Sequence, residues 1–490
     1  MEHNSPHFHR SLSLLDGALL VIGSMIGSGI FIVSADMTRN VGSAGWLMLV
    51  WLITGLMTMM AAISYGELSG MFPRAGGQYV YLKEAYNKLV GFLYGWSFFA
   101  VIQTATIAAV GTAFAKFTGY FFPVLNIEEQ NILMQLGSLK IYPAQLLSIT
   151  TIVLLTYVNS RGVKEGKYIQ LVFTFSKLLA LFGLIVFGFL LAKENFWQQN
   201  WQHAWTAVQD KGAVNATGNL TTSGWKEISG ITLLGAIAAA MVGSVFSSDA
   251  WNNVTFIAGE IKNPQRNIGL SLFLGTLTVT ILYMAMNLMY LYVLPLTDIA
   301  FARQDRVAVA AAGQIFGQAG PFIAAALIMV STFGCNNGLI LSGARVYYTM
   351  AHDGLFFKKA GQLNKAGVPQ WALWMQCLVA SLLCLSGRYG DLLDMISFVV
   401  VIFYVLTIAG IFILRKKRPE APRPYRAFGY PVLPALYILL GISFCVLLIL
   451  FKPGYTWPGL IIVLLGIPIY YLIQKRTTPT EADAKSGNNI

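Results

Sequence analysis

The chain has 490 residues, of which 56% are hydrophobic and only 11% are charged, and its mean hydropathy is +0.63. Soluble domains carry about 25% charged residues, so this composition excludes an ordinary soluble protein and predicts an all-α membrane protein with many spans. The formal net charge of +12 would suit a nucleic-acid partner, but the placement of the basic residues argues against one.

Twelve apolar segments are predicted to cross a bilayer, which takes roughly 20 residues per helix. They lie near residues 14–38, 44–69, 89–117, 143–160, 166–192, 228–258, 268–294, 319–350, 371–387, 391–414, 431–450 and 457–474. Most of the 33 Lys and Arg residues fall in one set of alternating loops, which includes both ends of the chain. Because such loops stay in the cytoplasm, both termini are expected there, and the basic linker 415–430 is expected to face lipid headgroups.

The first span contains a cluster of small residues within residues 14–36: Gly23, Ser24, Gly27, Ser28 and Gly29. Each glycine weakens a helix interior by roughly 1 kcal/mol relative to alanine, so this turn is expected to open. Opened backbone survives in lipid only where it lines a polar cavity or binds a ligand. The N–H groups of the second half-helix would then face an anion, such as a substrate carboxylate. The alternative is a glycine-rich helix that packs closely against its neighbours, and this stretch alone leaves both open.

The sixth span carries a polar run after Phe246: Ser247, Ser248, Asp249, Asn252 and Asn253. A carboxylate at that depth costs about 2.5–3.5 kcal/mol on insertion scales, which predicts a second break. Interrupted helices at corresponding places in two halves are typical of inverted-repeat transporters, here residues 13–192 and 227–414. The first break offers donors for a carboxylate and the second offers carbonyls for an ammonium group, so together they predict a site for an α-amino acid.

The individual roles at the second break follow from this arrangement. We expect the Asp249 side chain to bond to neighbouring backbone, while its carbonyl contacts the substrate. Phe246 is either a lid over the ligand or an ordinary packing residue. The remaining parts are predicted as a cytoplasmic tail 1–12, an external loop 193–226, two further spans in 431–474 and a cytoplasmic tail 475–490.

Lys177 lies in the middle of the fifth span. It is about 12 residues, or roughly 18 Å along a helix, from Glu165, which is too far for its stem to reach the membrane surface. It must therefore face the bundle interior and find acceptors there. Two roles stay open, a fixed internal counter-ion that stands where a sodium ion could bind, and a proton carrier whose pKa is lowered by burial.

The other reactive side chains predict neither a cofactor nor a metal site. The four cysteines, Cys335, Cys377, Cys384 and Cys445, all lie in apolar stretches, and no pair has the spacing of a metal site. Glu67 and Arg74 are expected to form an anchoring pair at the cytoplasmic end of the second span.

Several motifs together carry a family resemblance. They are GSMIGSGIF in the first span, YGELSGMFPRAGGQYVYL after the second, SKLLAL in the fifth, FSSDAWNNVTFIAGEIKNPQRN in the sixth and STFGCNNGLILSGARVYYTMAHDG in the eighth. In this order they resemble the amino acid–polyamine–organocation (APC) superfamily, and most closely its L-type amino acid transporter (LAT) branch. The resemblance covers roughly residues 10 to 450.

The resemblance implies a LeuT-type fold, in which two inverted repeats of five helices with broken first and sixth helices are followed by two further helices. It also implies a set of substrate contacts. The carboxylate would be held by Ile26, Gly27, Ser28 and Gly29, and the amine by the carbonyls of Phe246, Ser247 and Asp249.

The resemblance further assigns roles to single side chains. Phe246 matches the family's aromatic gate, and Asn252 matches an asparagine that supports substrate binding and coupling. Lys177 matches a lysine whose amine occupies the place where sodium-coupled relatives hold their ion. Eukaryotic L-type members also carry a cysteine between spans 3 and 4 that bridges to an ancillary glycoprotein, and residues 119–144 contain none. We therefore expect a stand-alone subunit in a bacterial inner membrane.

These features predict a sodium-independent transporter that exchanges one neutral L-amino acid for another by alternating access. A proton-coupled symporter with Lys177 as the titrating group is the alternative. A membrane sensor that binds amino acids without transporting them is a third class, which long appended signalling domains would favour. No pairing of catalytic side chains suggests an enzyme.

Overall fold

The computed structural model describes residues 10, 12–137, 139–215, 220–386 and 389–477. This part of the chain is almost entirely helical. The helices of its first half are α1 (Leu14–Met25), α2 (Gly29–Ile32), α3 (Ser34–Val41), α4 (Ala44–Met71), α5 (Gln78–Ala85), α6 (Lys88–Ser97), α7 (Gln103–Thr118), α8 (Pro143–Arg161) and α9 (Val163–Leu191). A π-helical turn, Phe98–Ile102, joins α6 to α7.

The second half continues the same pattern. Its helices are α10 (Trp197–Trp201), α11 (Gly230–Ser247), α12 (Asn253–Phe256), α13 (Pro264–Val293), α14 (Leu296–Ala300), α15 (Val307–Phe316), α16 (Gly320–His352), α17 (Gln370–Ser386), α18 (Tyr389–Lys417), α19 (Val432–Phe451) and α20 (Pro453–Thr477). Short antiparallel strand pairs lie in the loops: β1 (Met134–Leu136) with β2 (Leu139–Ile141), β3 (Val208–Gln209) with β6 (Lys226–Glu227), and β4 (Ala213–Val214) with β5 (Leu220–Thr221).

Ten helical segments of the described chain are long and apolar enough to cross a membrane. They are Leu14–Ile32, Ala44–Met71, Lys88–Thr118, Val172–Leu191, Gly230–Ser247, Pro264–Val293, Val307–His352, Leu392–Lys417, Val432–Phe451 and Thr456–Gln474. The two other predicted spans are α8 and the shorter α17. Helix α8 contains several polar residues, among them the buried Ser148, Thr151 and Asn159. These polar residues make its sequence less apolar than that of the other spans. The total of twelve spans stays a prediction.

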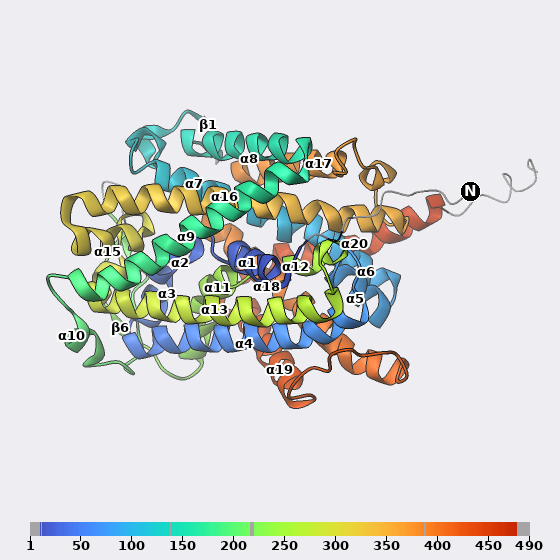
Figure 1. The fold of residues 1–490 in the computed structure, drawn as a ribbon. Helices are drawn as coiled ribbons and strands as arrows, with labels where there is room; N and C mark the ends of the chain where they lie inside the picture. The colour runs from blue at the N-terminus through green and yellow to red at the C-terminus, as the bar shows by residue number, and fades with distance from the viewer. Residues whose placement is uncertain (1–9, 11, 138, 216–219, 387–388, 478–490) are drawn as a thin grey trace, which may run out of the picture.

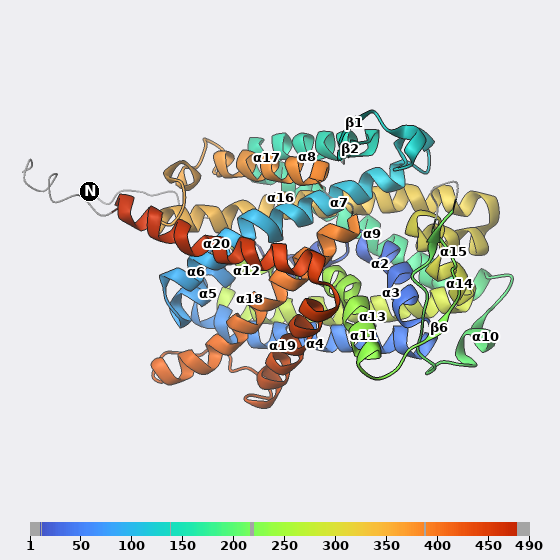
Figure 2. The same ribbon diagram turned by 180° about the vertical axis from the view of Figure 1, so that it is seen from behind.

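The interrupted helices lie in the middle of the molecule. Figures 1 and 2 place α1 and α12 between the α4–α13 pair on one side and α7, α8, α16 and α17 on the other. Helix α1 packs against α13, α16 and α9, and α11 packs against α3, α4, α18 and α19. The two breaks are therefore surrounded by helices from both halves of the chain.

The outer surface of the bundle is apolar. Large hydrophobic side chains are exposed along α9, α19 and α20, and Leu179 on α9 is 74% exposed. Monomeric soluble proteins rarely expose apolar patches of more than a few hundred Å². These helices therefore present a surface suited to lipid, while side chains near the breaks, such as Ile26 and Ile30, are completely buried.

The loop between α9 and α11 folds around the carboxylate of Asp210. This side chain accepts hydrogen bonds from the backbone N–H groups of Gly212, Ser223 and Gly224 and from the hydroxyls of Thr222 and Ser223. Burial raises the pKa of the Asp210 carboxyl, but the hydrogen bonds from Ser223 and Thr222 outweigh burial and hold that pKa well below its usual range.

Glu67 anchors the basic linker between α18 and α19 to the end of α4. Its carboxylate is 1% exposed and accepts two hydrogen bonds from Arg415, at 3.0 and 2.7 Å, and one from the N–H of Ala427 at 2.7 Å. Arg423 lies 3.4 Å from the same carboxylate. The prediction that Glu67 pairs with Arg74 was wrong. The guanidinium groups beside Glu67 come from residues more than 340 positions away in the sequence.

Replacing Glu67 by glutamine should destabilise the protein. The change leaves Arg415 and Arg423 beside a neutral side chain, and breaking a buried ion pair costs about 3–5 kcal/mol. We expect a lower melting temperature for Glu67→Gln in detergent. Glu420→Gln, at an exposed position of the same linker, is the control and should melt like the unmodified protein; equal melting of both variants would contradict the anchoring role.

Candidate substrate site

The first span is broken where its small residues cluster. Helix α1 ends at Met25, and Ile26 adopts extended angles of φ −73° and ψ 92°. Gly27 and Ser28 then lead into α2, and Val33 keeps right-handed helical angles between α2 and α3. Residues 29–41 therefore run as one half-helix, whose first N–H groups have no preceding helical carbonyls to bond.

The second break lies in the polar run of the sixth span. Helix α11 ends at Ser247, and α12 begins at Asn253. Between them Ala250 has a φ of 62°, in the left-handed region that a residue with a side chain rarely adopts. The N–H of Asp249 bonds to the carbonyl of Phe246 at 3.2 Å. The regular i to i−4 bonding of the helix ends here, so carbonyls at the end of α11 become available to other donors.

The two breaks meet directly. A Cβ added to Gly29 would lie 2.0 Å from Oγ and 3.0 Å from Cα of Ser247, so only glycine permits this approach. The hydroxyl of Tyr283, on α13, lies 2.9 Å from the carbonyl oxygen of Met25 and 3.0 Å from that of Ser247. The single phenol hydrogen of Tyr283 is therefore within reach of the last carbonyl of α1 and the last carbonyl of α11.

A cavity of about 290 Å³ lies between the breaks. Its walls include backbone and side chains of both, together with α7 and α16: Ser24, Met25, Gly27, Ser28, Gly29, Thr106, Val110, Phe246, Ser247, Asp249, Ala250, Cys335 and Leu339. Groups from both breaks therefore face the same small space.

Lys177 reaches the first break from α9. It is 0% exposed, and its ammonium group donates to the carbonyls of Gly23 at 2.6 Å and Ile26 at 2.8 Å. These are carbonyls at the end of α1, which the break leaves without helical N–H partners. A fixed positive charge therefore closes the C-terminal end of α1, where the helix dipole favours a cation.

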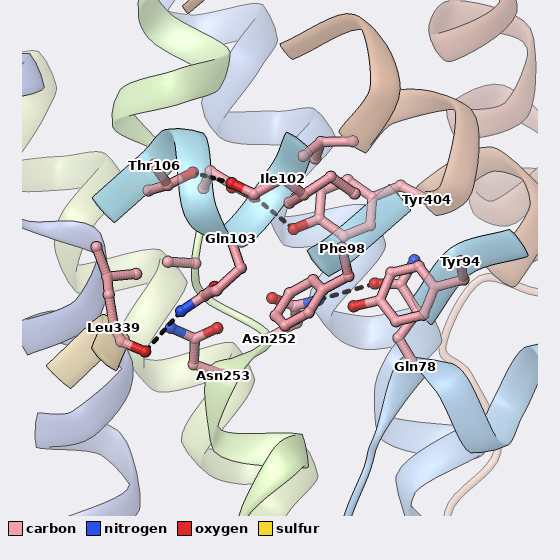
Figure 3. A pocket seen from close by; sticks show the side chains of 13 residues that line it. Gln78, Tyr94, Phe98, Ile102, Gln103, Thr106, Asn252, Asn253, Leu339 and Tyr404 are labelled. Atoms are coloured by element: carbon pink, nitrogen blue, oxygen red, sulfur yellow. Dashed lines mark hydrogen bonds between the residues drawn. The ribbon is translucent and has the colours of Figure 1, made fainter. Parts of the chain in front are cut away.

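A second cavity, of about 330 Å³, is also lined by Asp249, and Figure 3 shows other residues of its wall. The Asp249 carboxylate accepts a hydrogen bond from the hydroxyl of Tyr404, on α18, at 2.5 Å. The expectation of a backbone partner for this side chain was thus incomplete, because it missed a donor from a distant helix. Asn252 also faces this cavity and donates to Gln78 at 2.9 Å.

The structure brings most of the predicted site residues to the cavity between the breaks: Gly27, Ser28, Gly29, Phe246, Ser247 and Asp249. Ile26 is buried beside it with its carbonyl bound by Lys177, and Asn252 lines the second cavity instead. Sequence reasoning missed Tyr283 and Gln78. A tyrosine hydroxyl buried in an apolar span needs a hydrogen-bond acceptor. This need was the one feature of the sequence that could have pointed to a role for Tyr283.

In the part of the chain that the structure describes, no group of His, Cys, Asp or Glu side chains could hold a metal ion. Cys335, Cys377 and Cys384 are buried thiols, and Cys445 is half-buried. Cys335 lies at the first break, with Sγ 3.5 Å from the carbonyl oxygen of Ser24.

Adding a methyl group at Gly29 should force the two breaks apart. Overpacking of a close contact costs about 1–3 kcal/mol, so we expect Gly29→Ala to lower the melting temperature. Because the clash is with Ser247, adding Ser247→Gly should restore part of the loss, as a double-mutant cycle would measure.

The control for this pair is Gly183→Ala on α9. There a Cβ would meet Phe187 at an ordinary 3.9 Å, and alanine favours the helix by up to about 1 kcal/mol. Gly183→Ala should therefore leave the melting temperature unchanged or raise it. A Gly29→Ala protein as stable as Gly183→Ala would disprove the close contact between the breaks.

Comparison with known proteins gives three informative relatives. The chain is 27% identical over 470 residues to the mouse large neutral amino acids transporter small subunit 2, covering 94% of this chain and 81% of the relative. It is 27% identical over 476 residues to the human b(0,+)-type amino acid transporter 1, covering 96% and 89%. It is 29% identical over 472 residues to the serine/threonine exchanger SteT of Bacillus subtilis (strain 168), covering 95% and 97%.

These relatives are transporters, and they match this chain along nearly its whole length. The sequence model of a family described as amino acid permease matches residues 12–472. This range includes both breaks, Lys177 and all ten segments that can cross a membrane, except for the last residues of the final one. The chain is therefore an integral membrane protein of the amino acid permease family, within the APC superfamily.

Proposed function

We propose that this protein exchanges neutral L-amino acids across the membrane, independently of sodium, by alternating access around the two breaks. The observation that carries the proposal is the meeting of two interrupted helices at one buried cavity. Buried backbone groups at such a place cost free energy unless something bonds to them. A free amino acid carries the two charged groups that complement helix ends of opposite polarity.

In the proposed complex, the substrate carboxylate accepts hydrogen bonds from the backbone at residues 26–29. Its ammonium group donates to the carbonyls of Phe246, Ser247 and Asp249. Phe246, which is 7% exposed and lines the cavity, acts as the gate. Asn252 supports the site from the second cavity through its bond to Gln78.

Lys177 is proposed as the substitute for a bound sodium ion. Its ammonium already bonds to the carbonyls of Gly23 and Ile26, which are oxygen ligands of the kind that a hard cation takes. A covalently attached cation cannot leave during transport, so it braces the first break in every state without supplying an ion gradient. This favours exchange, in which the carrier returns loaded with a second amino acid.

The organisation around the site is proposed to be LeuT-type, with residues 13–192 and 227–414 as inverted repeats of five spans and residues 431–474 as two further spans. We propose that both termini are cytoplasmic and that the protein works as a stand-alone subunit in a bacterial inner membrane. Two relatives are named for neutral substrates, as large neutral amino acids transporter and as serine/threonine exchanger, which supports a neutral substrate here.

Counterflow in proteoliposomes tests the exchange. Vesicles preloaded with a neutral amino acid should take up labelled amino acid many-fold faster than empty vesicles, and replacing sodium by potassium should not change the rate. The carrier cannot return unloaded in an obligatory exchanger, which is the reason for this expectation. The measurement is initial uptake in the four combinations of loading and cation.

Each other class predicts a different outcome when a proton gradient and a thermal-shift measurement are added to this experiment. Rapid uptake into empty vesicles driven by a proton gradient would replace exchange by proton-coupled symport. Ligand-induced thermal stabilisation without any uptake would indicate a sensor. Sodium-stimulated uptake would contradict the role given to Lys177.

Removing the Lys177 ammonium should abolish exchange. In Lys177→Ala the carbonyls of Gly23 and Ile26 lose their donor, and each buried acceptor left unpaired costs about 1–3 kcal/mol. We expect substrate affinity to fall at least tenfold, equivalent to about 1.4 kcal/mol, measured by ligand-induced thermal shift and by counterflow. Lys193→Ala, which removes an exposed lysine beyond the end of the same helix, should retain both. Undiminished affinity in Lys177→Ala would exclude the bracing role.

A further inference from the structure

Apart from the bond between Asn252 and Gln78 and the carbonyl of Asp249, the walls of the cavity of about 330 Å³ beside the breaks have no role in the contacts proposed above. It shares four wall residues with the cavity between the breaks: Thr106, Asp249, Ala250 and Leu339. The two cavities therefore adjoin at the second break. The second cavity therefore borders the space that we propose for the charged ends of the substrate.

The walls of this second cavity are rich in hydrogen-bonding groups. Four carboxamides line it, from Gln78, Gln103, Asn252 and Asn253, together with the phenol of Tyr404. Figure 3 shows that these groups come from different elements and that the Gln103 and Asn253 carboxamides lie next to each other near Leu339. A core that only packed helices together would be lined by apolar side chains, because buried amides are costly unless paired.

Most of these groups already have partners. Gln78 accepts from Asn252 at 2.9 Å and donates to Thr407 at 3.0 Å, and Gln103 donates to the carbonyl of Leu339 at 2.5 Å. Asn253 is different. It is 2% exposed, and its Nδ2 is buried with no hydrogen-bond partner in the described part of the protein.

From this wall we infer that the second cavity receives the substrate side chain and selects amino acids whose side chains are polar and uncharged, carrying a hydroxyl or a carboxamide. The inference rests on the proposed function, since it assumes that an amino acid occupies the breaks. A hydroxyl or carbonyl oxygen can accept from Asn253, whereas an apolar side chain leaves that amide unpaired, and such sites reject the analogue that lacks the polar group.

The charge of the wall argues against an acidic side chain and leaves a single carboxylate as a partner for a basic one. Among the described residues that line the cavity there is no Lys, Arg or His to pair with an acidic side chain. The one carboxylate on the wall, that of Asp249, accepts from Tyr404 through one oxygen, and it is the only group of the described wall that could pair with a basic side chain. A neutral donor and acceptor fits the wall without breaking a contact.

Pairs of amino acids with the same shape test the selection in the unmodified protein. Threonine differs from valine, and asparagine from leucine, mainly by replacing apolar atoms with polar ones. We expect threonine and asparagine to bind at least tenfold more tightly than valine and leucine. The measurement is the ligand-induced thermal shift of the purified protein, followed by competition in counterflow, with lysine and glutamate included.

The two readouts separate the inference from the proposed function. Tighter binding of threonine and asparagine without exchange supports the selection and overturns the exchanger. Exchange in which valine and leucine compete as well as their polar partners, or in which lysine or glutamate competes best, overturns the selection alone. Failure of all twenty amino acids to bind overturns both.

Substituting Asn253 tests whether its carboxamide is the group that selects polar side chains. Asn253→Leu should collapse the threonine-to-valine and asparagine-to-leucine ratios toward one, because the unpaired amide is gone. Asn195→Leu, at an exposed position, is the matched control and should keep the ratios of the unmodified protein. Should Asn253→Leu fail to fold, the comparison of amino-acid pairs in the unmodified protein still decides the question. Unchanged ratios in a folded Asn253→Leu protein would overturn the role of Asn253.

Discussion

The structure depends on one constraint, which is that backbone groups released inside a membrane must find partners. Each broken span ends its first half-helix with carbonyls that no later N–H group of that helix can reach. Two side chains from other helices meet this demand. Lys177 bonds to Gly23 and Ile26, and the Tyr283 hydroxyl lies between the carbonyls of Met25 and Ser247. Without these donors the breaks would be costly in a medium that contains no water.

These contacts link the two breaks, so that one cannot move without changing its contacts to the other. Gly29 lies against Ser247 so closely that a methyl group would not fit, and Tyr283 contacts both half-helices. If α1 moves to open one side of the cavity, it must separate from Ser247, from Tyr283 or from Lys177. These short contacts stabilise the closed arrangement of the two breaks when no ligand is bound. In the proposed exchanger, a ligand that bonds to both breaks would replace the hydrogen bonds that such a movement breaks, and this would favour movement of the loaded carrier.

The local features of the site could be predicted from the sequence, whereas the partners could not. The positions of both breaks follow from glycine, serine and asparagine in apolar spans, and the burial of Lys177 follows from its distance to either end of a helix. These inferences use only neighbours along the chain. The partners of Asp249 and Glu67 come from α18 and the linker after it, more than 150 and 340 residues away. No local pattern specifies which distant side chain packs there, so Gln78, Arg415 and the pairing of Tyr404 with Asp249 needed the structure. The left-handed conformation of Ala250 was also invisible, because alanine has no preference for it.

The division of the site into two cavities separates recognition of an amino acid from choice among amino acids. Main-chain N–H and C=O groups would bind only the carboxylate and the ammonium group, which all twenty amino acids share. Such contacts give affinity without selectivity among amino acids. Discrimination must come from groups that meet the side chain, and in the arrangement inferred above those would be the carboxamides around Asn253. Changes of Gln78, Gln103 or Asn253 would then alter which amino acid is carried while the breaks, Tyr283 and Lys177 stay as they are. A family that carries diverse substrates on one scaffold would need this separation, because the backbone at the breaks has no side chain to vary.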